Sequence, residues 1–139
     1  MIRVLLPVDG SRIAERAARY VVAMARSGAA LKVLLLNVQP PWAPARSQTE
    51  RFEGARLHAR AAKRANRGAE SLLVAAGVAH ESRMRVGDPA RTILAAARQD
   101  HCDMIVMGTR GRGALAGLVL GSVAMKVVQL ARVPVTLVK

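Results

Sequence analysis

Residues 2–38 read IRVLLPVDGSRIAERAARYVVAMARSGAALKVLLLNV, and they are the clearest pointer to the fold class. The two ends of this stretch, residues 2–8 and 31–38, are almost wholly apolar and have the length of strands. Between them, residues 12–26 repeat apolar residues with the helical period, and charged residues lie on the opposite face. Strands that are apolar at nearly every position need cover on both faces, which a parallel sheet with crossover helices provides. The stretch therefore predicts a β-α-β unit.

The rest of the chain continues this alternation. Residues 39–47 hold three prolines and are expected to form a loop, and residues 48–76 are expected to form a long helix. One side of that helix is expected to carry Phe52, Ala55, Ala59, Ala62, Ala69, Leu73 and Ala76. Further strands are expected over residues 79–86, 103–107 and 134–138, and further helices over residues 89–99 and 122–131.

This order predicts an α/β protein with a doubly wound, Rossmann-like sheet. Right-handed crossovers place helices on both faces of five parallel strands, in the order 3-2-1-4-5. The 139 residues fit one domain with one core, so residues 1–139 are expected to form a single nucleotide-binding domain.

The composition of the chain indicates the cellular compartment in which it works. Cys102 is the one cysteine, so no intramolecular disulfide is possible, which suits a reducing compartment. The N-terminal residues lack the pattern of a secretory signal, and residues 113–125, an uncharged stretch as long as any in the chain, are too few to span a bilayer. We therefore expect a cytoplasmic protein with no membrane partner.

The strongly basic charge raises a nucleic-acid hypothesis. Lysine and arginine exceed aspartate and glutamate to give a formal net charge of +13. Aromatic residues make up only 2% of the chain, so platforms for stacking bases are scarce, and charge alone supplies no sequence specificity. A basic nucleic-acid binder stays an alternative, but we do not expect nucleic acid as the main partner.

A glycine-rich loop at the predicted reversal of strand order is the best candidate site. Doubly wound sheets bind ligands outside the carboxyl ends of their strands at this point, where Asp9 follows the first strand and Gly108 the fourth. Gly108 and Gly111 let backbone N–H groups approach phosphate oxygens, and Gly121-Ser122 opens a helix whose N-terminus attracts anions. The loop and the chain after it carry no acidic residue. This pattern favours a phosphorylated ligand.

Other readings of the loop stay open. The Walker pattern is absent, and the stretch from Gly111 to Ala116 matches only a relaxed dinucleotide pattern without its acidic ribose ligand. The glycines also fit a simple tight turn with close helix packing, with Ser122 as an ordinary N-cap. An alternative role for Asp9 is to cap the first helix. An alternative role for Val38 is that of an ordinary buried strand residue. Asp88 is expected to cap the helix that begins at Pro89.

With these residues in place, the sequence resembles the ATP-binding branch of the universal stress protein family. The spacing Gly108-x2-Gly111-x9-Gly121-Ser122 is similar to the glycine signature of that branch. The resemblance extends over nearly the whole chain, through VLLPVDGS, LLNV, GDPARTIL, MIVMGTRGRG and VPVTLVK. It implies an ATP-binding stress-response or signalling module. ADP and AMP contain the same adenosine and phosphate groups as ATP, so the sequence does not distinguish among the three nucleotides.

The resemblance also implies roles for individual residues. Asp9, with Pro7 and Val8, would face the adenosine, and the main chain of Val38 would read the adenine edge. Gly108, Arg110 and Gly111 would line the ribose and phosphates, with Met107 packed near the loop. The phosphates would be held by Gly121, Ser122 and Val123, with Mg²⁺ or Mn²⁺ between them and bound mainly by the phosphates. The resemblance further implies a homodimer through the last strand, Val133 to Val138, together with a protein partner that the sequence does not identify.

We do not expect an enzyme, because no nucleophile and base stand out and any ATP hydrolysis would be slow and metal-assisted. His58, His80 and His101 share no metal-ligand spacing, and Cys102 is expected to be inert. A dimeric interaction protein of the same fold, without a physiological nucleotide, remains the main alternative.

Overall fold

The computed structural model describes residues 1–42, 44–111 and 120–139. The elements in chain order are β1 (Ile2–Pro7), α1 (Arg12–Arg26), β2 (Leu31–Gln39), α2 (Gln48–Ala75), β3 (Ala79–Val86), α3 (Pro89–Gln99), β4 (Met104–Gly108), α4 (Ser122–Leu130) and β5 (Val135–Val138). Each predicted element is present, and its ends differ from the prediction by one residue at most. Such shifts arise where ladder and helix hydrogen bonds stop. Pro134, for example, lies just outside β5, although its carbonyl already accepts the Ile105 N–H at 2.9 Å.

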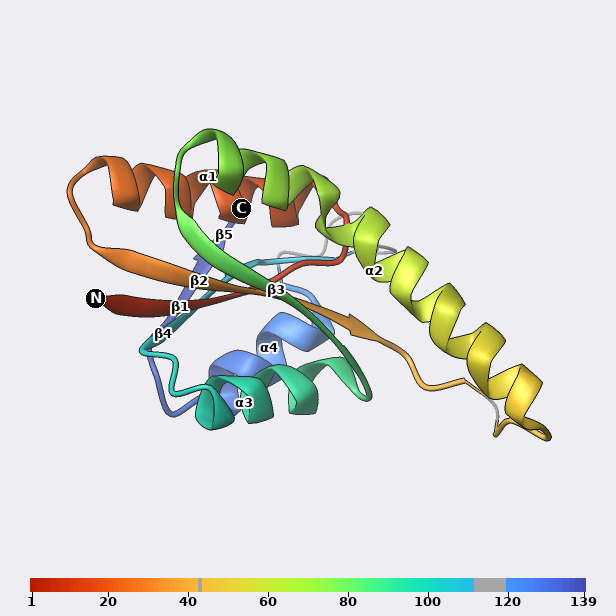
Figure 1. Cartoon of the computed structure of the whole chain (residues 1–139). Coiled ribbons are helices and arrows are strands. Elements are labelled where there is room, and N and C mark those ends of the chain that lie inside the picture. Colours follow the sequence, from red (N-terminus) through yellow and green to blue (C-terminus); the bar gives the residue numbers. More distant parts are fainter. Residues whose placement is uncertain (43, 112–119) are drawn as a thin grey trace.

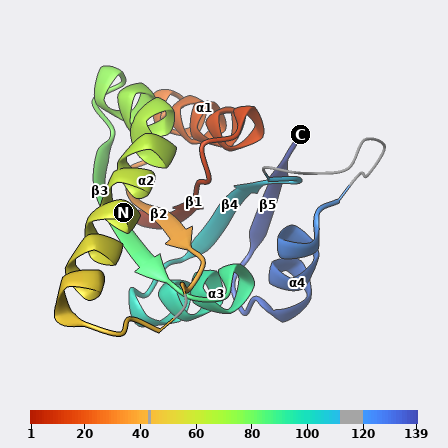
Figure 2. The same ribbon diagram turned by 90° about the vertical axis from the view of Figure 1, so that its right-hand side faces the viewer.

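The described strands form one parallel sheet in the order β3-β2-β1-β4-β5, as predicted. β1 lies at the centre, with β2 on one side and β4 on the other, so the strand order reverses between β1 and β4. Helices α1 and α2 cover one face and α3 and α4 cover the other (Figures 1 and 2). The polar strand β3 and the C-terminal strand β5 are the two edges.

Two apolar layers, one on each face, explain the unbroken hydrophobic runs. Alternate residues of β1, such as Val4 and Leu6, join a cluster with α1 and α2. Leu5 points the other way, into a cluster with α3 and α4. Because helices cover both faces of the sheet, apolar strand residues stabilise the fold whichever face they point to.

Helix α2 is much longer than the strands that it covers, and its N-terminal half projects beyond the sheet (Figure 1). On the side of α2 that was predicted to carry its apolar residues, Ala62, Ala69 and Leu73 are buried. Nearer the N-terminus the same side is exposed: Phe52 is 70% exposed, and Ala55 and Ala59 are exposed too, because the helix there extends beyond the sheet (Figure 1). None of the described helices is both long enough and apolar enough to cross a bilayer.

Candidate functional site

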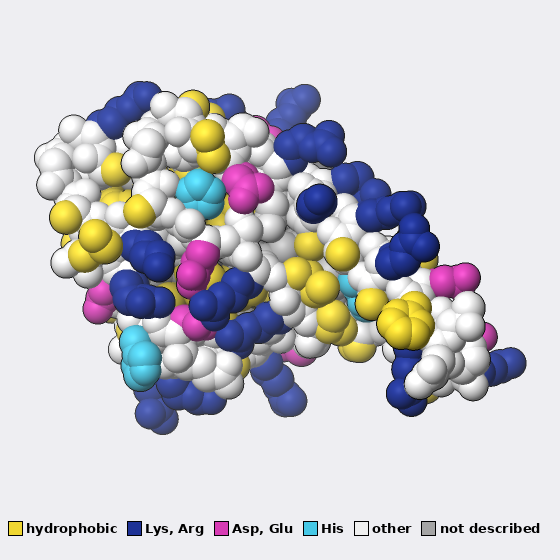
Figure 3. Space-filling model, in the orientation of Figure 1, with side chains coloured by type: hydrophobic (Ala, Val, Ile, Leu, Met, Phe, Trp, Pro, Cys, Tyr) yellow, Lys and Arg dark blue, Asp and Glu magenta, His cyan; other side chains and the backbone are white. Residues whose placement is uncertain are grey.

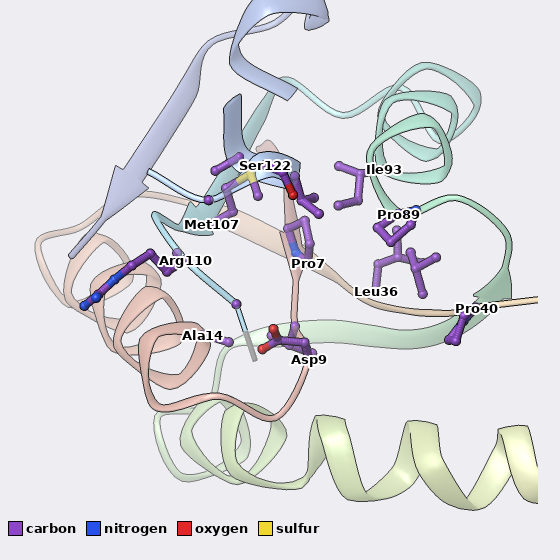
Figure 4. A pocket seen from close by; sticks show the side chains of 17 residues that line it. Pro7, Asp9, Ala14, Leu36, Pro40, Pro89, Ile93, Met107, Arg110 and Ser122 are labelled. Atoms are coloured by element: carbon purple, nitrogen blue, oxygen red, sulfur yellow. The ribbon is translucent and has the colours of Figure 1, made fainter. Parts of the chain in front are cut away.

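A pocket of about 650 Å³ opens at the carboxyl ends of β1 and β4, where the strand order reverses (Figure 4). This volume lies in the usual range for small-molecule sites. Every residue predicted for the site lines the pocket: Pro7, Val8, Asp9, Val38, Met107, Gly108, Arg110, Gly111, Gly121, Ser122 and Val123. The fold therefore brings residues from four separate parts of the sequence together around one cavity.

A backbone hydrogen bond joins the two glycine turns. The N–H of Gly121, at the start of α4, donates to the carbonyl oxygen of Thr109 at 2.7 Å. Thr109 is itself only 7% exposed, and its N–H donates to the Val138 carbonyl at 2.9 Å, which ties the loop to β5. A Cβ on Gly121 would lie 3.3 Å from the Thr109 oxygen and 3.4 Å from the Arg110 Cα. The turn after β4 and the N-terminus of α4 are thus in close contact.

Asp9 reaches the first glycine turn from β1. A Cβ on Gly111 would lie 2.5 Å from the Asp9 Oδ2, which is closer than real side chains allow. The other carboxylate oxygen, Oδ1, accepts the Ser11 N–H at 3.0 Å. Ser11, rather than Asp9, is the N-cap of α1, because its Oγ accepts the Ala14 N–H at 3.1 Å. The carboxylate of Asp9 therefore lies at the pocket, between the first helix and the glycine loop.

Gly108 has a packing role of its own. A Cβ at this position would collide with Cγ2 of Ile13 and would lie 3.2 Å from the Arg110 carbonyl oxygen. Close helix packing, one of the alternative readings of the loop, therefore applies to Gly108. Gly113 and Ala116 of the relaxed dinucleotide pattern lie outside the described residues.

The alternative role of Ser122 as an N-cap was wrong. Gly121 occupies the N-cap of α4, at φ −74°, and no side chain caps this helix. The first intrahelical bond runs from the Met125 N–H to the Gly121 carbonyl, so the amides before Met125 have no partner within the helix. The exposed Ser122 side chain lies on the pocket wall (Figure 4). The N-terminus of α4 thus presents backbone donors and a hydroxyl to the cavity, as an anion site requires.

Charge around the pocket is sparse among the described lining residues. Asp9 is their one carboxylate, and Arg110 is their one cation. In Figure 4 the Arg110 side chain extends away from the cavity, so its backbone is what lines the wall. Backbone amides and the helix terminus are therefore the main anion-binding features here.

Comparison with known proteins identifies the family of the chain. The model of the universal stress protein family matches residues 1–139. The chain belongs to the universal stress protein family. A universal stress protein of Thermus aquaticus is 39% identical over 137 residues, which cover 98% of this chain and 97% of the relative.

Solved structures of the family have the same fold. The structure of the protein MJ0577 has a TM-score of 0.82 and 28% identity, and the match covers 99% of this chain and 95% of that one. A universal stress protein solved in complex with cAMP has a TM-score of 0.68 and 27% identity, over 99% of this chain and 97% of that one.

In this universal stress protein, sequence reasoning missed most of the apolar wall of the pocket. The missed lining residues are Ala14, Leu36, Pro40, Pro89, Ile93 and Ala124. Pro40 directly follows β2, and Pro89 begins α3 soon after β3 ends. Both could have been found by applying the rule of carboxyl-end ligand sites to every strand of the sheet.

Sequence reasoning also missed Asn37, which does not line the pocket but bonds to Val8, a residue that does. Asn37 is 2% exposed, its Nδ2 donates to the Val8 carbonyl at 2.9 Å, and its Oδ1 accepts from Gln39 Nε2 at 2.6 Å. A buried polar residue inside an apolar strand was the available signal. Asn37 thereby couples the end of β2 to the end of β1.

Other candidate residues lie outside the pocket lining. Asp88 is the N-cap of α3, as predicted, and accepts the Arg91 N–H at 3.1 Å. His58 is buried against Trp42, with ring centroids 4.2 Å apart, and His80 lies beside Glu70. No group of three or more metal-ligating side chains occurs among the described residues. Cys102 is buried, and that burial raises the pKa of its thiol, which disfavours the reactive thiolate.

Proposed function

We propose that this universal stress protein binds an adenine nucleotide, ATP with Mg²⁺ or Mn²⁺, in the pocket between β1 and β4. The observation that carries the proposal is the hydrogen bond from the Gly121 N–H to the Thr109 carbonyl, which brings two glycine turns together beside Asp9. Glycine amides and the N-terminus of α4 suit phosphates, and the apolar wall around Leu36 and Ile93 suits a base. The relative bound to cAMP supports a site for adenine nucleotides.

The residues present fit the nucleotide better than a metal ion alone. Gly111 approaches the Asp9 carboxylate, and Gly121 approaches the Thr109–Arg110 backbone, only because neither glycine has a side chain, and these approaches bring both turns to the pocket. Of the described lining residues, Asp9 alone offers a carboxylate, so the divalent cation would be held mainly by the phosphates. When bound, the cation would neutralise part of the negative charge of the phosphates.

Isothermal titration calorimetry with ATP and Mg²⁺ tests the proposal. We expect saturable binding to one site per chain. A flat trace would instead support the alternative of a dimeric interaction protein without a physiological nucleotide. ADP and AMP titrated in the same buffer would show which phosphates contribute to binding.

We further propose that the protein acts through nucleotide occupancy, in stress response or signalling, rather than through catalysis. A ligand that binds two conformations unequally shifts the population between them, and with it any surface that differs between the two. The single lining carboxylate, Asp9, already accepts a hydrogen bond from Ser11, and neither histidine nor cysteine is among the described lining residues. The pocket thus offers little to activate a water molecule.

We therefore expect phosphate release from MgATP to stay at the background rate. The measurement is a coupled phosphate assay over several hours, with the Gly121→Val variant as the matched preparation. A contaminating ATPase would persist in both preparations. Release that exceeds background in the natural protein and is absent from the variant would contradict the expectation.

A homodimer through residues 133–138 is also proposed. β5 pairs with β4 on one side and forms the edge of the sheet on the other, so its outer edge can accept a second strand (Figure 2). We expect light scattering to give twice the mass of the chain. The carbonyls of Pro134 and Val138 accept from β4, so the N–H of Leu137, between them in the alternation, faces the outer edge. Replacement of Leu137 by proline should remove this N–H and shift the population toward monomer. A monomeric natural protein at micromolar concentration would contradict the proposal.

A further inference from the structure

The outward face of α2 carries a row of cations that the nucleotide pocket does not use. We call Arg56, Arg60, Lys63, Arg64 and Arg67 the basic stripe. Their spacing of three and four residues puts them on one side of the helix, opposite the buried residues such as Ala62 and Leu73. All five are exposed. Figure 3 shows lysine and arginine side chains gathered along the outward side of α2.

The basic stripe has no neutralising partner among the described residues. The described ion pairs of arginine, lysine and histidine involve Arg19, Lys32, His80, Arg83 and Arg85. No aspartate or glutamate occurs between Glu53 and Glu70, so the stripe has no acidic residue within its own span. Neighbouring like charges on a helix repel each other. A polyanion that neutralised them would relieve this repulsion.

We propose that the basic stripe is a docking surface for the phosphate backbone of duplex nucleic acid. The stripe extends for about 16 Å along the helix axis, at about 1.5 Å per residue. Duplex DNA carries one charge per roughly 1.7 Å with both strands counted, so a length of this size holds about ten phosphate charges, of which those on the near side can contact the five cations. Each contact between a cation and a phosphate releases a condensed counterion, which supplies affinity without any reading of sequence.

The scarcity of aromatic residues, which argues against sequence-specific or single-strand binding, does not oppose this kind of contact. Backbone recognition of a duplex needs no stacking platform, whereas single strands are held largely by stacking on aromatic rings. An anionic membrane fits less well. An interfacial helix inserts an apolar face between lipids, and the apolar residues of α2 at Ala62, Ala69 and Leu73 are buried within the protein.

Fluorescence anisotropy with a labelled duplex of arbitrary sequence, about 20 base pairs long, tests the proposal. We expect binding at about 50 mM salt, with a log–log salt slope of about −4 to −5 for five phosphate contacts. Arg60→Gln/Arg64→Gln should weaken binding at least tenfold and reduce the slope by about 2. A single strand of equal length should bind more weakly than the duplex.

The matched control is Arg98→Gln/Arg132→Gln, which removes the same charge from exposed positions at the C-terminal end of α3 and in the connection between α4 and β5. We expect this control to keep both the affinity and the slope of the natural protein within about twofold. Equal weakening by the two pairs would show that net charge alone acts, and it would overturn the proposal. So would absence of binding at low salt, or equally strong displacement by polyglutamate or by phosphatidylserine vesicles. The basic stripe shares no residue with the lining of the pocket, so the affinity for the duplex should be the same with and without saturating MgATP. Duplex binding should also persist if the protein turns out not to bind nucleotide.

Discussion

Replacing Gly121 by valine should abolish measurable MgATP binding, with Kd raised at least about a hundredfold, which corresponds to about 2.7 kcal/mol. The first added carbon would already lie 3.3 Å from the Thr109 carbonyl oxygen and 3.4 Å from the Arg110 Cα. The two further methyl groups would push the Thr109–Arg110 turn away from the start of α4 and so separate the two glycine turns that the phosphate site needs together. The backbone at Gly121 has φ −74°, which any residue can adopt, so the change strains no dihedral angle and acts only by displacing the neighbouring turn.

Titration calorimetry measures this loss, and the urea midpoint reports whether the variant is folded. Gly54→Val is the matched control, because Gly54 lies on α2 and a Cβ there meets only ring carbons of Trp42, at 3.4 and 3.6 Å. We expect the control to bind MgATP as the natural protein does. A folded Gly121→Val protein with unchanged Kd would show that the second glycine turn does not hold the phosphates.

Replacing Leu6 by alanine should lower the free energy of unfolding by about 2–5 kcal/mol. Leu6 is fully buried on the central strand β1, in the apolar cluster under α1 and α2, and it is paired in register with Leu35 of β2. Strands on both sides leave the site little freedom to collapse around the cavity. The loss would be a large part of the 5–15 kcal/mol that typically stabilises a domain.

Urea unfolding followed by circular dichroism measures the change in stability. Leu57→Ala is the control, since Leu57 is 49% exposed on α2 and its truncation should cost no more than about 0.5 kcal/mol. If Leu6→Ala and Leu57→Ala lowered the free energy of unfolding equally, the difference in burial between the two leucines would have no effect on stability. That result would contradict the two-layered core. If the m-value, the slope of the unfolding free energy against urea concentration, is the same in the variant and the natural protein, the lower urea midpoint reflects a loss of stability.

The fold was predictable because local pattern and global arrangement agree. Val4, Leu5 and Leu6 are consecutive apolar residues, and they serve two different core clusters. Only a strand covered on both faces explains such a run, and right-handed crossovers then leave few sheet orders. The rule that ligands bind at the carboxyl ends of the strands predicts one site at Asp9 and Gly108, and both residues line the pocket.

Other features depend on distances that periodicity does not contain. The overhang of α2 exposes Phe52, because a helical pattern does not show where the neighbouring sheet stops. The cap of α4 could not be assigned from Gly121-Ser122, since either residue suits an N-cap. Leu36 and Ile93 lie far apart in sequence on β2 and α3, and only the folded sheet brings them to one wall of the pocket.

Amide resonances of ¹⁵N-labelled protein, followed during titration with MgATP, test the central claim most directly. We expect the N–H signals of Gly111, Ser122 and Val123 to move together and to fit one Kd, because these residues line one proposed anion pocket. Signals from β3, at the far edge of the sheet, should stay in place. If MgATP moved the β3 signals and left the amides of Gly111, Ser122 and Val123 unchanged, the nucleotide would bind elsewhere and the proposed site would be wrong.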